Sequence, residues 1–314
     1  MGLNQRNRLG FELLERRALM AGDVFVAIEG ELLRVEGDNL ANQVTLSQTI
    51  AGDLVVSGQN GTTINGMPSV RFVRPVINAA EIRMEGGDDA VVLRGLQLAN
   101  DLFVDLGAGN DRLTSPAATP ISVGANASIF GEAGNDTIQL NRTKVFEDLY
   151  IDGGIGALAA TVTDASIDKS MTIVGDEAND SVSVVGSTIG LDLSIETKGG
   201  SDTVRVSQLK ALSLFINTDS NGAVGRDVVN ISNASIVEDL GVFTGAGDDV
   251  VRLTETSSNK VTVSLDQGND RLEATNVVAA TDIIFEGGAG FDTLLETDVF
   301  ASIFRDYKEF ERIL

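Results

Sequence analysis

The sequence contains no histidine, no cysteine and no tryptophan among its 314 residues. Without histidine, the chain has no Ser-His-Asp or Cys-His nucleophile system, no histidine general base and no His-ligated zinc. Without cysteine it has no disulfide framework, but a long stacked core needs none, so this absence says little about the compartment. The side chains left for catalysis are those of Asp, Glu, Lys, Arg, Tyr and Ser.

Proline and long apolar runs are also scarce. The chain has four prolines against 34 glycines, and 43% of its residues are apolar, which is typical of all-β and repeat proteins. No stretch approaches ~18 consecutive apolar residues, so we expect no membrane-spanning helix. The net charge is −23, which makes nucleic acids and anionic membranes poor partners and cations natural ones.

Residues 1–22, "MGLNQRNRLGFELLERRALMAG", differ in composition from the rest of the chain. They carry four Arg and two Glu, a net charge of +2. The charged residues interrupt the apolar core that a secretory signal peptide needs. The spacing of Phe11, Leu14 and Ala18 predicts a short amphipathic helix, so we expect this first segment to be helical or flexible.

The same segment resembles the LEPR-XLL-type N-terminal motif of large extracellular and surface proteins of bacteria. Within "RLGFELLERRALMAGD", the matching residues are Phe11, Glu12, Leu14, Glu15, Arg17, Leu19, Met20, Ala21 and Gly22. Arg16 stands where that family usually has proline. The resemblance covers about sixteen residues; it implies export and an extracellular or cell-surface location, and it implies nothing about activity.

From residue 23 onward the sequence repeats about every 22 residues. Each unit has an anchor aspartate, with apolar residues nine and seven positions before it and two, sometimes four, positions after it. The anchors are Asp89, Asp111, Asp136, Asp180, Asp202, Asp227, Asp249, Asp270 and Asp292. Successive anchors are 21, 22 or 25 residues apart, except for one interval of 44 residues that Leu158 divides equally. Such a period is the signature of a repeat architecture.

The apolar pairs alternate with period two, so each unit holds two short strands joined by a glycine-aspartate turn. A unit this short cannot bury its apolar face alone, and successive units must stack. We therefore predict an all-β fold: a parallel β-solenoid, a right-handed β-helix of about twelve coils and roughly 60 Å. Short, irregular stretches such as 119–123 and 143–146 would form its third side. An antiparallel array of β-hairpin units is the alternative.

Both ends of the repeat need protection from edge pairing. Upstream, Asn42 anchors a further unit, and a looser one turns near Thr62. We expect the repeat domain to cover residues 23–297. Residues 298–314 leave the pattern and carry Phe300, Phe304, Tyr307 and Phe310, which indicates a cap over the last coil.

The turns themselves suggest a metal. "GAGND" (107–111), "EAGND" (132–136), "GAGDD" (245–249), "DQGND" (266–270) and "GGAGFD" (287–292) resemble the G-G-x-G-x-D-x-U-x nonapeptide of RTX-type calcium-binding β-rolls. That resemblance implies calcium held by aspartate carboxylates and glycine carbonyls. In RTX proteins the motif recurs every nine residues, whereas here it occurs once per coil. The candidate metal ligands are Asp89, Asp111, Asp136, Asp248, Asp249, Asp270 and Asp292.

Electrostatics leaves two roles open for these aspartates. Stacked at about 4.8 Å, adjacent carboxylates repel by roughly 1 kcal/mol even in water. Either backbone N–H donors of the turn neutralise each carboxylate, or calcium ions bridge the column through oxygen ligands. Leu158 would interrupt any such row.

The competing interpretation is an enzyme that acts on polysaccharides, because right-handed β-helices include such lyases and hydrolases. Asp105, Asp152, Glu196 and Glu286 share one outward register, with aromatic residues nearby, and paired carboxylates can hydrolyse glycosides. A second group is Arg205, Arg252, Arg271 and Glu273. Regular acidic spacing along a stack arises without catalysis, so we assign no catalytic residue. The favoured function is a structural or adhesive module, with calcium as its candidate stabiliser and a surface or matrix partner that the sequence does not identify.

Overall fold

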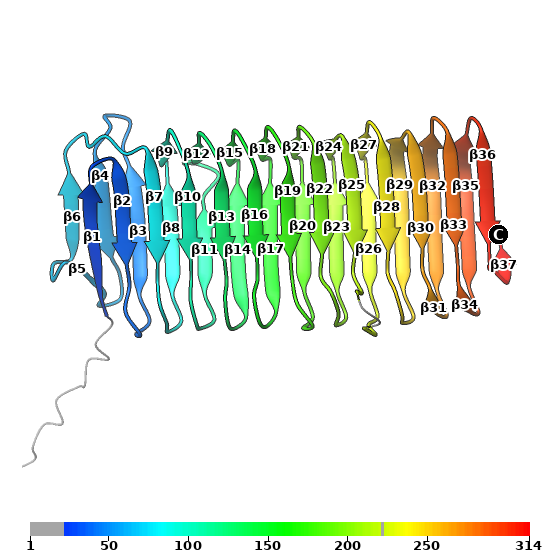
Figure 1. Cartoon of the computed structure of the whole chain (residues 1–314), viewed down its shortest axis with the longest axis horizontal. Coiled ribbons are helices and arrows are strands. Elements are labelled where there is room, and N and C mark those ends of the chain that lie inside the picture. Colours follow the sequence, from blue (N-terminus) through cyan, green and yellow to red (C-terminus); the bar gives the residue numbers. More distant parts are fainter. Residues whose placement is uncertain (1–21, 221–222) are drawn as a thin grey trace, which may run out of the picture.

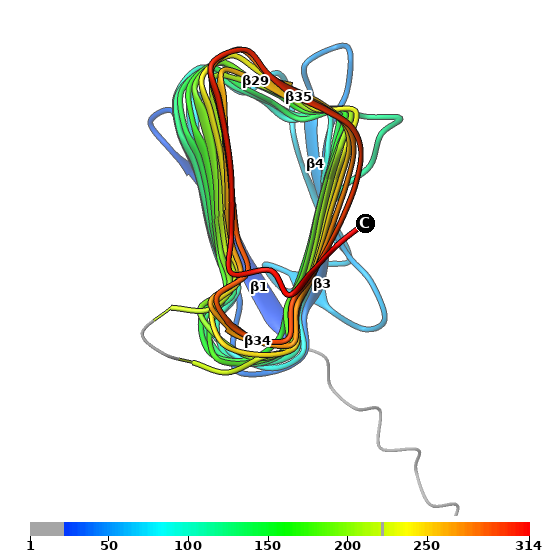
Figure 2. The same ribbon diagram turned by 90° about the vertical axis from the view of Figure 1, so that its right-hand side faces the viewer.

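The apolar pairs around each anchor aspartate form the strands that their alternation predicts. A computed structural model describes residues 22–220 and 223–314, and Figure 1 shows their strands side by side along one axis. Viewed end-on, the coils superpose as a flattened tube with two long sides, and the chain winds in the right-handed sense toward its C-terminus (Figure 2). The stack has about eleven turns.

Each long side of the tube is one parallel sheet. The first side contains β7 (Ala79–Arg83), β10 (Leu102–Asp105), β13 (Ala127–Phe130), β16 (Leu149–Asp152), β19 (Met171–Val174), β22 (Asp192–Glu196), β25 (Ser213–Asn217), β28 (Asp239–Phe243), β30 (Lys260–Ser264), β33 (Asp282–Glu286) and β36 (Phe304–Lys308). The second side contains β8 (Ala90–Arg94), β11 (Arg112–Ser115), β14 (Asp136–Asn141), β17 (Leu158–Thr163), β20 (Ser181–Val185), β23 (Thr203–Ser207), β26 (Val228–Ser232), β29 (Val250–Ser258), β32 (Arg271–Ala279) and β35 (Thr293–Ala301). The glycine-aspartate turns join the first side to the second.

Short strands close the tube at the opposite corner, where the sequence predicted an irregular third side. They are β9 (Gln97–Leu98), β12 (Ser122–Val123), β15 (Lys144–Val145), β18 (Ser166–Ile167), β21 (Thr188–Ile189), β24 (Lys210–Ala211) and β27 (Ser235–Ile236). In the last three coils this corner is part of the long strands β29, β32 and β35. Two-residue strands β31 (Gln267–Gly268) and β34 (Ala289–Gly290) pair within the glycine-aspartate turns.

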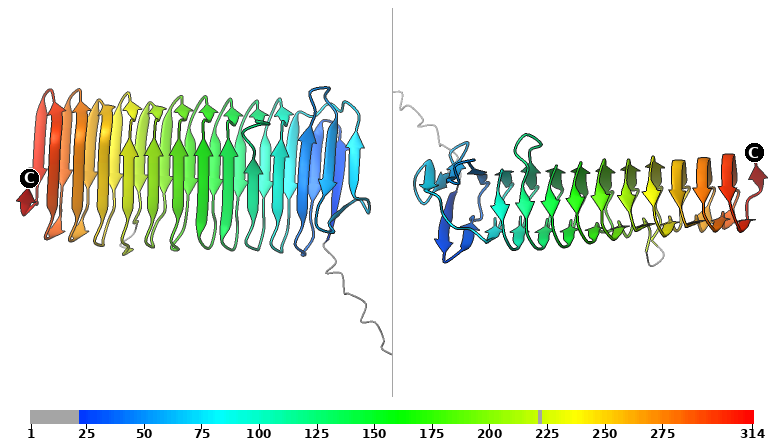
Figure 3. Two further views of the ribbon diagram at one scale, coloured as in Figure 1. Left: turned by 180° about the vertical axis from the view of Figure 1, so that it is seen from behind. Right: turned by 90° about the horizontal axis from the view of Figure 1, so that it is seen from above.

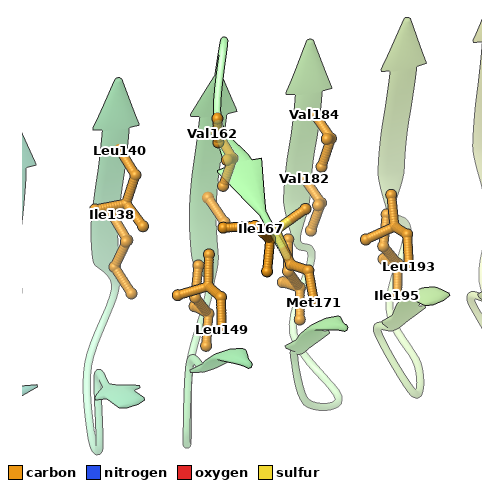
Figure 4. Close-up of a cluster of buried hydrophobic side chains, with 14 of the residues drawn as sticks. Ile138, Leu140, Leu149, Val162, Ile167, Met171, Val182, Val184, Leu193 and Ile195 are labelled. Carbon is orange, nitrogen blue, oxygen red and sulfur yellow. The ribbon is translucent and has the colours of Figure 1, made fainter. Parts of the chain in front are cut away.

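Parallel, in-register pairing places equivalent side chains above one another. Leu193 pairs with Met171 and Leu214, and all three side chains are fully buried. Figure 4 shows such apolar side chains from neighbouring coils filling the interior together. Each fully buried Val, Leu or Ile contributes about 1.5–3 kcal/mol to the free energy of folding. A single coil would expose these side chains on both of its flat ends. The stability of the fold therefore depends on stacking.

The N-terminal end of the tube is built differently. β1 (Asp23–Glu29) forms an antiparallel hairpin with β2 (Leu32–Glu36), and β3 (Gln43–Gln48) pairs antiparallel with β4 (Leu54–Gly58). β6 (Ser69–Phe72) then pairs antiparallel with β4, and β5 (Thr63–Ile64) pairs with β1. The unit predicted at Asn42 is present, because β2 and β3 pair with β7 and β8. The looser unit predicted near Thr62 is wrong: its residues make hairpin pairs that close the first coil.

The C-terminal residues add a last, partial coil. β36 pairs in parallel with β33, and β37 (Arg312–Ile313) pairs with β35. Tyr307 stacks on Phe285 with ring centroids 5.3 Å apart. The boundary expected at residue 297 falls within β35.

The structure confirms the predicted fold class, and among the residues that it describes antiparallel pairing is confined to the N-terminal hairpins. The described ranges contain no helix, hence none long and apolar enough to cross a membrane. The helix predicted within residues 1–22 lies outside the described residues except for Gly22.

Candidate functional site

A column of buried aspartates lies under the glycine-aspartate turns. In each coil, Oδ1 of the anchor aspartate accepts a hydrogen bond from the backbone N–H of the equivalent residue in the preceding coil. The N···O distances are 2.6–2.8 Å throughout. We call this column the inner ladder; its members are Asp89, Asp111, Asp136, Asp180, Asp202, Asp227, Asp249, Asp270 and Asp292, each at most 2% exposed. It ties nearly every coil to the next.

The inner ladder is interrupted at the position that the sequence predicts. Leu158 has no carboxylate to offer, so the N–H of Asp136 donates to the carbonyl of Ala157 at 2.9 Å instead. The N–H of Leu158 still donates to Asp180, at 2.7 Å. The stack therefore continues through the break with a backbone bond in place of one carboxylate bond.

A second ladder runs along the outside of the same turns, in the opposite direction. Here the side chain just before the anchor accepts the N–H of its equivalent in the following coil. Asp88 accepts from Asn110, Asn110 accepts from Asn135, and the distances are 2.8 and 3.0 Å. Asp248 accepts from Asn269 at 2.8 Å. We call this column the outer ladder; it explains the Asn or Asp that precedes the anchor in these turns.

The glycine two positions before the anchor lets the turns stack closely. A Cβ on Gly109, Gly134, Gly156, Gly225, Gly247, Gly268 or Gly290 would lie 1.4–2.1 Å from the carbonyl oxygen of the equivalent glycine in the preceding coil. Any side chain at these positions would push adjacent coils apart. Each residue of the Gly-Asn-Asp signature therefore serves stacking. The glycine lets adjacent turns approach, the Asn accepts a hydrogen bond in the outer ladder, and the Asp accepts one in the inner ladder.

The second carboxylate oxygen of the inner ladder is the unusual chemical feature of the site. Within the described ranges, Oδ2 is buried without a hydrogen-bond partner in Asp89, Asp111, Asp136, Asp202, Asp227, Asp249, Asp270 and Asp292. Burial raises the pKa to about 7 for Asp89, Asp111, Asp202, Asp249 and Asp270, and to about 6 for Asp136 and Asp180. Neighbouring carboxylates contribute in the same direction, as Asp136 does for Asp111. A protonated carboxyl still offers Oδ1 as an acceptor.

The outer ladder has the opposite electrostatics. The backbone and side-chain N–H groups of Asn110 lower the pKa of Asp88, and those of Asn269 lower the pKa of Asp248. Both carboxylates are exposed to solvent and stay ionised. The turn thus combines an inner column that binds protons readily with an outer column that does not.

The residues predicted to bind calcium are distributed over both ladders. Asp89, Asp111, Asp136, Asp249, Asp270 and Asp292 lie in the inner ladder, and Asp248 lies in the outer one. Calcium needs six to eight oxygen ligands around one point, whereas each inner Oδ1 already accepts an N–H. No group of three or more acidic side chains in the described part of the chain is arranged to hold a metal. Calcium binding at these residues therefore stays a prediction.

The metal prediction left out three members of the inner ladder. Asp180, Asp202 and Asp227 follow "DEAN", "KGGS" and "AVGR", and none of these three turns is among the five that resemble the RTX nonapeptide. Their spacing and flanking apolar pairs were sufficient to place them, because register along the stack decides which aspartate enters the column.

The outward face of the first sheet carries the other acidic candidates. Asp105 and Asp152 flank Phe130 at one register position, so their strands are about 10 Å apart. Glu196 and Glu286 lie further along the same row. The rings of Phe103, Phe130 and Tyr150 form a zigzag with centroid separations of 5.5 and 5.7 Å.

A shallow depression lies at the edge of this face. Arg83, Glu85, Asp105 and Glu132 line it. The Arg83 guanidinium pairs with Glu81 at 2.7 Å and lies 4.9 Å from the centre of the Phe103 ring.

The other charged group that the sequence singled out lies on the second sheet. Glu273 pairs with both Arg252 and Arg271, at 3.3 and 2.5 Å. Arg205 lies opposite Asn230 of the neighbouring strand.

Replacing one stacking glycine tests the close approach of the turns. In Gly134→Ala the new Cβ would lie 1.6 Å from the carbonyl oxygen of Gly109, and we expect a loss of about 3 kcal/mol or more in the free energy of unfolding. Gly30→Ala is the control, because Gly30 also has positive φ but no atom within 4 Å of its Cβ position; about 1 kcal/mol is expected there. Urea unfolding followed by circular dichroism measures both, and equal losses would contradict this role.

The inner ladder predicts a rod that is stabilised by mild acid. Because its pKa values lie above the ordinary 3.8, the folded chain binds protons that the unfolded chain does not. The stabilisation is complete below about pH 4 and is lost as pH rises through about 7. We expect the thermal midpoint of the wild-type chain to rise as the pH is lowered from 8 to 5. The Asp111→Asn variant should have a higher midpoint than the wild type at pH 8 and a weaker dependence of the midpoint on pH.

Asp248→Asn is the matched control for that experiment, since Asp248 lies in the same kind of turn but has a lowered pKa. We expect no increase in the midpoint at pH 8 for this variant. A wild-type midpoint that falls steadily from pH 8 to pH 5 would show that the inner carboxylates do not hold protons.

Comparison with known proteins assigns this chain to no family. No protein-family model matches it, and no curated protein and no solved structure matches it either.

Proposed function

We propose that the chain is an exported structural or adhesive module at the cell surface or in the extracellular matrix of a bacterium. The observation that carries this proposal is the stacking of the coils, in which the inner ladder and backbone hydrogen bonds link successive turns. A stack of about eleven coils is roughly 50 Å long. Such a module separates what is attached at its two ends and presents two long faces between them.

The chemistry of the surface favours a structural role over a catalytic one. On the outward face of the second sheet, small polar residues such as Thr137, Ser183 and Thr203 recur, which suits a β-sheet without requiring a substrate. Carboxylates recur at one register position of the first sheet, in Asp105, Asp152 and Glu196. A repeat produces such a row without any catalytic role. A net charge of −23 favours solubility and a cationic or neutral partner.

Polysaccharide cleavage remains the second candidate, and one feature favours it. The depression lined by Arg83, Glu85, Asp105 and Glu132 is where an arginine and three carboxylates meet. Arg83 is already engaged by Glu81 and Asp105, which suits a structural ion-pair network better than a free catalytic base. We therefore place the adhesive module first.

The proposed location rests on the resemblance of residues 8–23 to the LEPR-XLL-type motif, and a localisation experiment tests it. The full chain and a variant lacking residues 1–22 would be produced with an epitope tag after residue 314 in a bacterium whose surface proteins carry this motif. We expect antibody labelling of intact cells for the full chain and loss of labelling for the variant. Labelling of permeabilised cells is the control for expression, and equal labelling of intact cells by both chains would refute this role of the segment.

The candidate cofactor is tested by unfolding the chain with millimolar calcium and with EDTA. Because each inner Oδ1 accepts an N–H, we expect the thermal midpoint to change no more with calcium chloride than with magnesium chloride. A calcium-specific increase that EDTA reverses and that Asp248→Asn or Asp270→Asn reduces would establish the calcium-stabilised form of the module.

A further inference from the structure

The regular corner of the tube is broken in two places that face each other. In the coil of Asp111, residues 116–120 add three residues to the usual 22, and they stand out from the row of corners in Figure 3. In the first coil, the hairpin of β3 and β4 turns at residues 49–52. Between them lies the corner of the intervening coil, with Gly95 and Gln97. These three segments line one cleft.

Both walls of the cleft are fixed by hydrogen bonds. In the hairpin turn, the N–H of Gly52 donates to the carbonyl of Thr49 at 2.8 Å, and the N–H of Asp53 donates to the Thr49 hydroxyl at 3.1 Å. In the insertion, the N–H of Thr119 donates to the carbonyl of Pro116 at 3.0 Å. Prolines at both ends of the insertion restrict it further. The cleft is therefore preformed, which reduces the entropic cost of binding.

The floor is tied to both walls. The N–H of Gly95 donates to the carbonyl of Thr119 at 3.0 Å, and the N–H of Gln97 donates to Oε1 of Gln48 at 2.7 Å. The second bond orients the Gln48 amide across the floor. The three segments, distant in sequence, thus form one unit.

The chemistry of the lining differs from that of the rest of the surface. Its residues are Gln48, Thr49, Ile50, Gly52, Gly95, Gln97, Ala118, Thr119 and Pro120, so it has amides, hydroxyls and apolar groups but no ionisable side chain, in a chain with 22% charged residues. Ile50 is fully exposed at the rim. Apolar walls with a few fixed hydrogen-bonding groups are the usual composition of small-ligand sites.

We propose that this corner cleft, lined by Gln48, Gln97 and Thr119, binds a neutral sugar unit of a glycan. Amide and hydroxyl groups exchange hydrogen bonds with sugar hydroxyls, and Ile50, Ala118 and Pro120 contact the C–H faces of the ring. A charged ligand would find no ion-pair partner in the lining and would lose solvation there. The inference rests on the proposed adhesive function and names its ligand class.

Titration of the isotopically labelled full chain with neutral oligosaccharides tests the site. Maltohexaose, cellohexaose and mannohexaose are the probes, and oligogalacturonate is the charged control. We expect amide chemical-shift changes at Gly52, Gly95 and Gln97 with at least one neutral probe, saturating in the millimolar range, and none with the charged one. Shift changes only elsewhere, or none with any neutral probe, would overturn the proposal.

Two kinds of variant locate the binding. Replacing residues 116–120 by Asn-Gly restores a 22-residue coil and removes one wall, so the shift changes should disappear. Thr119→Val with Gln97→Ala removes two polar groups without shortening the backbone, which keeps the test valid if the shorter coil folds poorly; at least tenfold weaker binding is expected. Thr188→Val, at the same corner in a regular coil, is the matched control and should leave binding unchanged.

The outcome is separable from that of the localisation experiment. A chain that binds the sugar without appearing on intact cells would refute the surface location and keep the site. A surface-exposed chain whose cleft responds to a basic or apolar peptide instead of the neutral sugars would refute the site and keep the module.

Discussion

The structure depends on one interaction, the hydrogen bond from a backbone N–H in one coil to a buried aspartate in the next. In a turn that is not part of a sheet, this N–H would otherwise need another acceptor, as the N–H of Asp136 finds in the carbonyl of Ala157, because an unpaired buried N–H costs about 1–3 kcal/mol. Asp111 supplies the acceptor for Asp89 and in turn needs Asp136. Each coil therefore supplies a hydrogen-bond acceptor that its neighbour needs. These bonds fix the register of the coils, which the burial of Val, Ile and Leu alone does not specify.

This arrangement places negative charge where solvent does not reach. The carboxylates are held about one strand spacing apart, and one oxygen of most of them has no donor. Proton uptake relieves the repulsion without removing the acceptor at Oδ1, so the column tolerates a high density of aspartate. The exposed outer ladder, with Asn110 and Asn269 as donors, keeps its charge and its solvation. Two similar residues in one turn thus have different chemistry because one lies inside and the other outside.

The regular coils and the features specific to this chain lie in different parts of the molecule. Regular coils contribute length and flat faces, and they look alike along the stack. The features that distinguish the molecule are the N-terminal hairpins and the insertion at residues 116–120, which together with the corner between them form the corner cleft. All four prolines, Pro68, Pro75, Pro116 and Pro120, lie in these irregular segments, where no regular ladder bond is required of them.

The sequence by itself determined the repeat, the strands, the stacking and which aspartates share a column, because apolar periodicity and spacing are local properties. It also placed Leu158 as the break. The tertiary structure alone decided that the anchors bond to backbone N–H groups, because that depends on which oxygen faces the neighbouring coil. It replaced the expected coil near Thr62 by antiparallel hairpins, since the first coil has no earlier coil to pair with. It also brought Gln48 and Thr119 to one cleft, which only the packing of three successive coils can do.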